Sequence, residues 1–261
     1  MNEGQALAWP FLFLTLANCY FSRDNIMGHA KNKIPSCDQC ELCTFTVFKS
    51  VTTQDLAEVS DSKINLFIPK GQRIFSEGNM PNGLYALYSG KVKIHKNAIS
   101  GSEQIIQLLA PGDVFGYKAL LCAEPYGSSA TAIEDSLVCL ISQDVFNKIL
   151  DKSHLFKKDI IFTLSDDLDF AQNRIELSNK PARERVLNAL LSILTVYGMN
   201  EETGELNAKL PRKDLSSLAG LTLETTIRTL TALKGECIID FEGKKIFIPN
   251  KAKFLNTTTV V

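Results

Sequence analysis

Short runs of alternating hydrophobic and polar residues fill the middle of the chain, between Lys63 and Ser142. A period of two is typical of β-strands, and glycine-containing turns such as Pro69-Lys70-Gly71 and Ser89-Gly90-Lys91 separate the runs. Glycine supplies the positive φ that a reversing chain needs. About eight short strands with such turns predict an antiparallel double-sheet jelly roll. The clearest runs are residues 64–68, 84–88, 92–94 and 105–109.

The pattern changes to a helical one over residues 144–178. Apolar residues recur there at alternating spacings of three and four, which is typical of an a/d seam. The seam consists of Ile161, Leu164, Leu168, Ala171 and Ile175. A seam of this length favours a partner helix, although the pattern alone also allows it to pack on the chain's own jelly roll.

Two short helical patterns near the C-terminus are separated only by Gly220 and Leu221. The first covers residues 213–219, and the second follows Thr222, which can cap a helix N-terminus. Segments this close must meet at a steep angle, which predicts a helix-turn-helix, although an αα-hairpin with a solvated face has the same pattern. A preceding helix over 182–197 and two strands, 237–239 and 246–248, around a turn complete a predicted winged helix.

Glu224, Thr225 and Arg228 fall on the outer side of the second helix, near its N-terminal end. This end of a recognition helix enters the DNA major groove, where arginine binds guanine and glutamate accepts from cytosine. Lys244 and Lys245, at the wing, are candidates for phosphate contacts or are simply solvated. Beyond residue 179 there are 12 Lys and Arg against 9 Asp and Glu, so positive charge lies on this part.

Three of the seven cysteines, Cys37, Cys40 and Cys43, form a C-x2-C-x2-C run. Thiolates this close can converge on zinc or on an iron–sulfur cluster, with a fourth ligand from elsewhere in the chain. A ferredoxin is disfavoured because no fourth cysteine and proline follow, and an inert structural role is the alternative. The odd count and the weak secretory signal favour a reducing, cytoplasmic location.

The first residues include an apolar stretch, residues 9–17, that is too short to span a bilayer. Glu3 precedes this stretch, where a secretory signal has a basic region, so we expect neither secretion nor membrane anchoring. We expect residues 1–30 to be an N-terminal extension that is disordered or that results from a start upstream of a natural one at Met27.

Three blocks resemble the sensor domain of the Crp/Fnr transcription regulators: residues 70–78, 84–93 and 111–116. The resemblance extends from Cys37 to Ile248 with every block in the family's order, and it includes the helix-turn-helix. It implies double-stranded DNA as a partner, a homodimer, and contact with RNA polymerase.

Within the family, cyclic AMP receptors hold the nucleotide with a glutamate and an arginine–serine pair. By resemblance the glutamate falls at Tyr117, the arginine at Ser128 and the serine at Ser129. Without a cation for the phosphate, the charge-assisted contact is lost. We therefore expect no binding of cyclic AMP.

The oxygen-sensing branch of the family, the fumarate and nitrate reduction regulator type, holds a [4Fe–4S] cluster through three arm cysteines and one on a late strand. Cys37, Cys40 and Cys43 match the arm, and Cys139 matches the strand, with Cys122 as a reserve ligand. The arm spacing departs from the C-x2-C-x5-C of the best-known members, which leaves the geometry of ligation open.

We thus expect an α+β protein that regulates transcription in response to oxygen or redox state through this cluster. Its predicted parts are residues 1–30, an extension; 31–150, arm and jelly-roll sensor; 151–180, dimerisation helix; and 181–261, winged helix. Alternatives are a regulator that senses haem, nitric oxide, zinc or thiol oxidation, and a redox protein without DNA binding. No enzyme motif is present, and the three histidines lie far apart.

Overall fold

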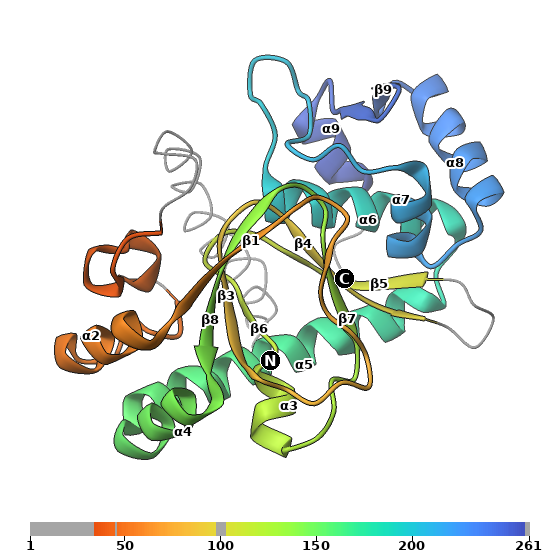
Figure 1. Ribbon diagram of the computed structural model, residues 1–261. Helices are drawn as coiled ribbons and strands as arrows, with labels where there is room; N and C mark the ends of the chain where they lie inside the picture. The colour runs from red at the N-terminus through yellow and green to blue at the C-terminus, as the bar shows by residue number, and fades with distance from the viewer. Residues whose placement is uncertain (1–33, 45, 98–102, 259–261) are drawn as a thin grey trace, which may run out of the picture.

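The computed structural model describes residues 34–44, 46–97 and 103–258. The expectation for residues 1–30 lies outside them. Two four-stranded antiparallel sheets face each other and form the predicted jelly roll (Figure 1). One sheet has the order β1 (Ile64–Ile68), β8 (Ser136–Ser142), β3 (Gly83–Ser89), β6 (Val114–Phe115). The other has the order β2 (Arg73–Phe75), β7 (Ser129–Ala132), β4 (Val92–Asn97), β5 (Glu103–Leu109).

Cys139 lies in the central strand β8, paired with Asn65 of β1 on one side and Ala86 of β3 on the other. The turn into β4 requires glycine at position 90, where φ is +95° and a Cβ would lie 2.6 Å from the Asp135 carbonyl oxygen. The glycine in this turn is therefore required by sterics, because the turn after β3 lies close to the start of β8.

Short helical segments flank the strands of the jelly roll. The cysteine arm forms two 3-10 turns, η2 (Cys37–Gln39) and η3 (Glu41–Thr44), and leads into α2 (Thr53–Ser62), whose N-terminus Thr52 caps. A short helix, α3 (Tyr117–Cys122), follows β6, and α4 (Gln143–Lys152) follows β8.

Residues 144–178 are helical as expected, and the chain breaks once within them, between α4 and α5 (His154–Ser178). Ser153 has an extended backbone there, and its hydroxyl accepts a hydrogen bond from the Phe156 amide at 3.2 Å, which starts a new helix. On α5, Ile161, Leu168 and Ile175 are 63%, 58% and 69% exposed, whereas Leu164 packs against the core. Most of the seam therefore does not pack on the chain's own jelly roll.

The C-terminal module, α6 to α9, has the predicted winged helix-turn-helix. Its elements are α6 (Ala182–Tyr197), α7 (Arg212–Ala219), α8 (Leu223–Gly235), β9 (Asp240–Glu242), β10 (Lys245–Phe247) and α9 (Lys251–Thr257). Gly220, with φ of +64°, ends α7, and Thr222 caps α8 by accepting from the Thr225 amide at 3.2 Å.

The wing begins later than the predicted strand 237–239. Cys237 has φ of +54° just after α8, and Ile238 and Ile239 are buried in the core of the module. Since these two isoleucines pack in the core, they do not form part of the wing, and its first strand is β9.

The module rests on the jelly roll through β5, since Ile105, Leu108 and residues of α6 share one core. Lys93 of β4 joins the two parts with an ion pair to Asp214 of α7 at 3.0 Å, and it also pairs with Glu103 of β5 at 2.5 Å. The helix α8 lies at the outer edge of the molecule (Figure 1). Among the described residues, no helix combines the length and the apolar character that a membrane span requires.

Candidate functional site

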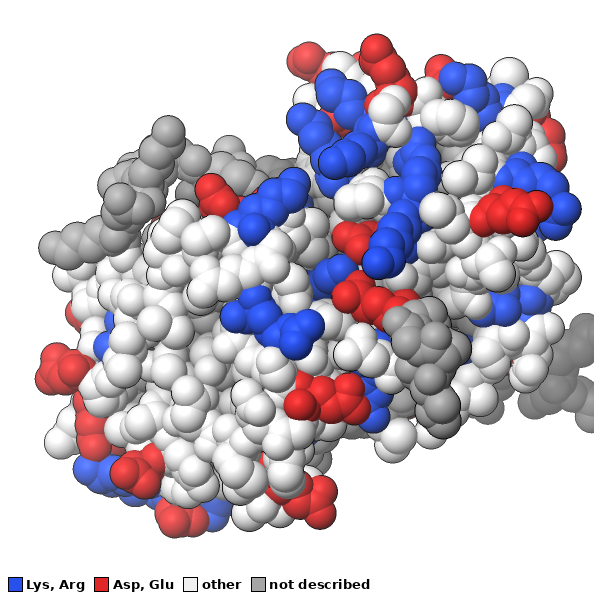
Figure 2. Space-filling view, turned by 45° about the vertical axis from the view of Figure 1, so that its right-hand side comes forward, with Lys and Arg blue, Asp and Glu red and all other residues white. Residues whose placement is uncertain are grey.

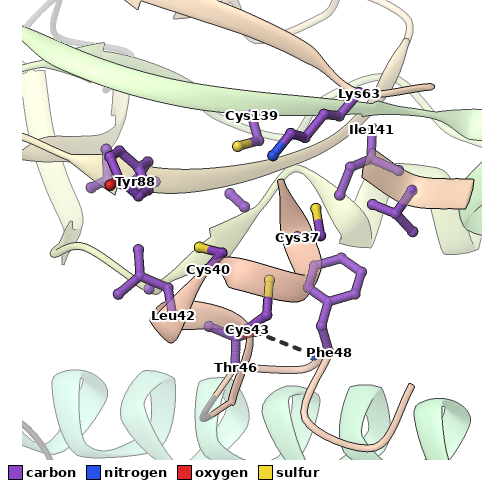
Figure 3. A pocket seen from close by; sticks show the side chains of 14 residues that line it. Cys37, Cys40, Leu42, Cys43, Thr46, Phe48, Lys63, Tyr88, Cys139 and Ile141 are labelled. Carbon is purple, nitrogen blue, oxygen red and sulfur yellow. Dashed lines mark hydrogen bonds between the residues drawn. The ribbon is translucent and has the colours of Figure 1, made fainter. Parts of the chain in front are cut away.

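The arm turns bring Cys37, Cys40 and Cys43 to one side of a small pocket, and Cys139 of β8 faces them (Figure 3). Two hydrogen bonds hold the arm against α2. The Cys37 amide donates to the Ser60 hydroxyl at 3.1 Å, and the Lys63 ammonium donates to the Pro35 carbonyl at 2.5 Å. Residues far apart in sequence thus place four sulfurs around one space.

The rest of the pocket wall is mainly apolar, and the Lys63 side chain reaches into it (Figure 3). The apolar lining includes Leu42, Phe48, Val59, Leu87 and Ile141. The space is small, about 30 Å³, so a group as large as a cubane cluster needs the pocket walls to move apart.

The three arm thiols influence one another's acidity. Interaction with Cys37 and Cys40 raises the pKa of the Cys43 thiol. Interaction with the Cys43 thiol, with the charge of Lys63, lowers the pKa of Cys37 to about 7 and that of Cys40 to about 6. Burial instead raises the pKa of Cys139 to about 12. Cys37 and Cys40 are therefore the arm's thiolates near neutral pH, whereas Cys43 and Cys139 would both have to lose a proton on binding a metal centre.

Cys122, the reserve ligand, does not lie in this pocket. It is exposed at the end of α3. In the described ranges, no three His, Cys, Asp or Glu side chains are placed to hold a single metal ion. A [4Fe–4S] cluster makes a different demand, because each of its four cysteines binds a different iron.

Tyr117, at the position of the family's ribose-binding glutamate, is buried and forms a bond across to α5. Its hydroxyl donates to Asp167, which also accepts from Gln107 at 3.3 Å and pairs with Lys118 at 2.8 Å. Burial and the carboxylate of Asp167 raise the pKa of Tyr117. The position thus holds a neutral phenol beside a carboxylate, with the nearby Lys118 already paired.

We expect cyclic AMP not to bind at micromolar concentration. Its phosphate would meet Ser128 in place of an arginine, and a buried charge without a partner is costly. Titration calorimetry of the protein with cyclic AMP checks this. Heat that saturates in the micromolar range would contradict the expectation and restore the nucleotide-sensor alternative.

On α8, Glu224 and Arg228 are exposed, as predicted, and they share this open helix face with Leu223 and Ile227. Neither charged side chain has an ion pair with the described part of the chain, so both are available to a ligand. The Thr225 hydroxyl accepts from the Thr222 hydroxyl at 2.9 Å and so supports the cap. Thr226, Leu230 and Leu233 form the buried side of the helix.

The two wing lysines differ. Lys244 is exposed at the tip, whereas Lys245 pairs with Glu205 at 3.0 Å. Phe241 of β9 lies between two cations, the Arg212 guanidinium and the Lys234 ammonium, each 4.8 Å from the ring centroid. Arg212 also donates to the Gly243 carbonyl at 3.1 Å. The wing is therefore held against α7 and α8, and Lys244 is the better candidate for a phosphate contact.

Lys and Arg side chains gather over the upper part of the molecule, where the C-terminal module lies, with acidic side chains between them (Figure 2). The sequence reasoning did not single out Lys63, Lys118 or Arg212. Each acts on residues distant in the chain, and no local pattern marks such contacts. Asp167 was likewise not identified as the partner of Tyr117, because the contact joins α3 to α5.

Comparison with known proteins agrees with this architecture. Residues 66–153 match the cyclic nucleotide-binding domain family, and residues 184–256 match the Crp-like helix-turn-helix domain family. The chain is 30% identical over 227 residues to the fumarate and nitrate reduction regulatory protein of Vibrio cholerae, covering 86% of this chain and 89% of that protein. It is 31% identical over 172 residues to the cyclic AMP receptor protein of Thermus thermophilus, covering 66% and 77%.

Among solved structures, FixK2 from Bradyrhizobium japonicum has a TM-score of 0.68 at 25% identity, covering 76% of this chain and 98% of that one. The two family matches follow each other along the chain in the same order as the domains of the structure, jelly roll first and helix-turn-helix second. The relatives are regulators rather than enzymes, and the exposed α8 fits a recognition helix. The chain therefore belongs to the Crp/Fnr family of DNA-binding transcription regulators.

Proposed function

We propose that this regulator responds to oxygen or redox state through a [4Fe–4S] cluster held by Cys37, Cys40, Cys43 and Cys139. The observation that carries the proposal is that a single pocket is lined by all four sulfurs, three from the arm and one from the centre of a sheet. The resemblance to the Vibrio cholerae regulator, whose name refers to fumarate and nitrate reduction, supports it.

The donor set suits such a cluster. Thiolates are its usual ligands, and an apolar wall protects it from water. Four thiolates add more negative charge than the cluster core offsets, and the Lys63 ammonium stands where it would balance the excess. When bound, the cluster supplies an oxygen-labile redox centre.

The arm is also tied to the dimerisation helix. The Phe48 ring stacks on Phe156 of α5 with centroids 5.6 Å apart, and Lys49 pairs with Asp159 at 3.3 Å. Moving the arm toward or away from β8 would therefore pull on the first turns of α5. This gives a physical route from the state of the cysteine pocket to the seam.

The exposed seam of α5 supports a homodimer. Ile161, Leu168 and Ile175 would be covered by the same residues of a second copy, as in a coiled coil. Such a dimer would set its two α8 helices about one turn of DNA apart, 34–36 Å. Contact of the DNA-bound dimer with RNA polymerase is part of the proposal, by family resemblance.

One preparation tests the proposal. Protein purified without oxygen should be brown, hold about four irons per chain and bleach in air. Analytical ultracentrifugation of the same sample should show dimers that shift toward monomers after bleaching. Colourless protein with one zinc per chain would reject the cluster, and protein that stays monomeric when brown would reject the link to dimerisation.

A further inference from the structure

The recognition helix carries an apolar pair beside its charged pair. Leu223 and Ile227 are each 46% exposed. In the described part of the C-terminal module, one other large apolar side chain is exposed. It is Leu255 on α9, which is 39% exposed. An isolated apolar residue on a surface is ordinary, but here two of the three exposed ones lie together on the helix that faces DNA.

The placement of the pair follows from helix geometry. Residues four apart lie one turn above each other, so Leu223 and Ile227 form a short ridge parallel to that of Glu224 and Arg228. All four side chains are exposed on this outer side of α8. Neither apolar residue is needed to close the core, whose side of α8 consists of Thr226, Leu230 and Leu233.

Most threonine hydroxyls of α8 are already engaged with the helix itself. They donate to carbonyls one turn earlier, Thr226 to Thr222 at 3.0 Å, Thr229 to Thr225 at 2.8 Å and Thr231 to Ile227 at 3.0 Å. These groups have less to offer to base edges. The outer face of the helix therefore presents two charges and an apolar ridge.

The major groove has one apolar group to match such a ridge, the C5-methyl group of thymine. We propose that Leu223 and Ile227 are specificity-determining residues that pack on thymine methyl groups next to the base pairs contacted by Glu224 and Arg228. This inference rests on sequence-specific DNA binding and deepens it by naming the bases that flank the charged contacts.

Deoxyuridine provides a direct probe, because uracil keeps the hydrogen-bonding edge of thymine and lacks only the methyl group. The preferred site is first identified by binding protein purified without oxygen to a library of random DNA duplexes and sequencing those that it retains. In that site, each thymine is then replaced singly by uracil, and binding is measured. At contacted positions affinity should fall about fourfold, since burying one methyl group is worth about 0.8 kcal/mol.

Ile227→Ser should remove the preference for thymine over uracil at the position that Ile227 contacts, and Leu223→Ala should remove it at the position that Leu223 contacts. Serine has a helix propensity close to that of isoleucine, so the first change should leave α8 intact. Leu255→Ala, which truncates an exposed apolar side chain on α9 rather than α8, should keep the preference at both positions. Two results would overturn the inference while leaving sequence-specific binding intact. One is a selected site in which no thymine-to-uracil change alters affinity. The other is a preference for thymine over uracil that survives in Ile227→Ser and Leu223→Ala. Failure to select any site would overturn both.

Discussion

A chain in which Cys139 is replaced by serine is expected to retain roughly tenfold less iron than the native chain after purification without oxygen. Loss of even an outer partner of a metal ligand costs about 10–100-fold in metal affinity, and here a ligand itself would be lost. Cys139 is the pocket's one sulfur from outside the arm. Without it, three thiols on adjacent turns would have no anchor on the sheet. Iron analysis and the visible absorbance spectrum measure the effect.

Cys122→Ser is the matched control, because it makes the same chemical change at an exposed cysteine at the end of α3. It should retain the iron of the native chain. Circular dichroism should show both variants folded, since the change is one atom in size. Full iron in Cys139→Ser together with loss in Cys122→Ser would show that the fourth ligand has been assigned to the wrong cysteine.

Arg228→Ala is expected to cost about 1–3 kcal/mol of binding free energy on the preferred operator and to relax discrimination at one base pair. The Arg228 guanidinium is exposed and unpaired within the described chain, so its donors are free for a guanine edge. Competition binding against operators substituted at single base pairs measures both effects.

Lys244→Ala is the comparison for this variant, since Lys244 is exposed at the wing tip. If it contacts only phosphate, its loss should weaken all sequences alike and lower the salt slope by about one. Lys245→Ala should do less, because Glu205 already holds that ammonium. Equal weakening of cognate and random DNA in Arg228→Ala would instead make Arg228 a backbone contact, contrary to the recognition model.

Periodicity could predict most of the fold because each element buries a face that its own sequence repeats. The strands of the jelly roll, the helix-turn-helix and the Thr222 cap are all of this kind, and the structure confirms them. Boundaries were less predictable. The break at Ser153 and the late start of the wing depend on single backbone conformations and on which isoleucines the core takes.

The candidate sites divide in the same way. That Glu224 and Arg228 lie on an outer helix face follows from residues four apart, and the arm cysteines are close because seven residues cannot separate them far. Their roles as ligands and base contacts remain predictions. Whether Ile227 turns inward or outward could not be decided from a helical wheel, since it lies at the edge of the buried face. The docking of α8 on the module core leaves it exposed.

The sequence by itself determined the family, the order of the domains and the chemical kind of each candidate site, because these depend on local patterns and residue types. Only the tertiary structure decided which partners meet. Cys139 rather than Cys122 faces the arm, Lys63 enters the cysteine pocket, and Tyr117 bonds to Asp167. Each of these contacts joins segments far apart in the chain, and their proximity results from how sheets and helices pack rather than from any pattern along the chain.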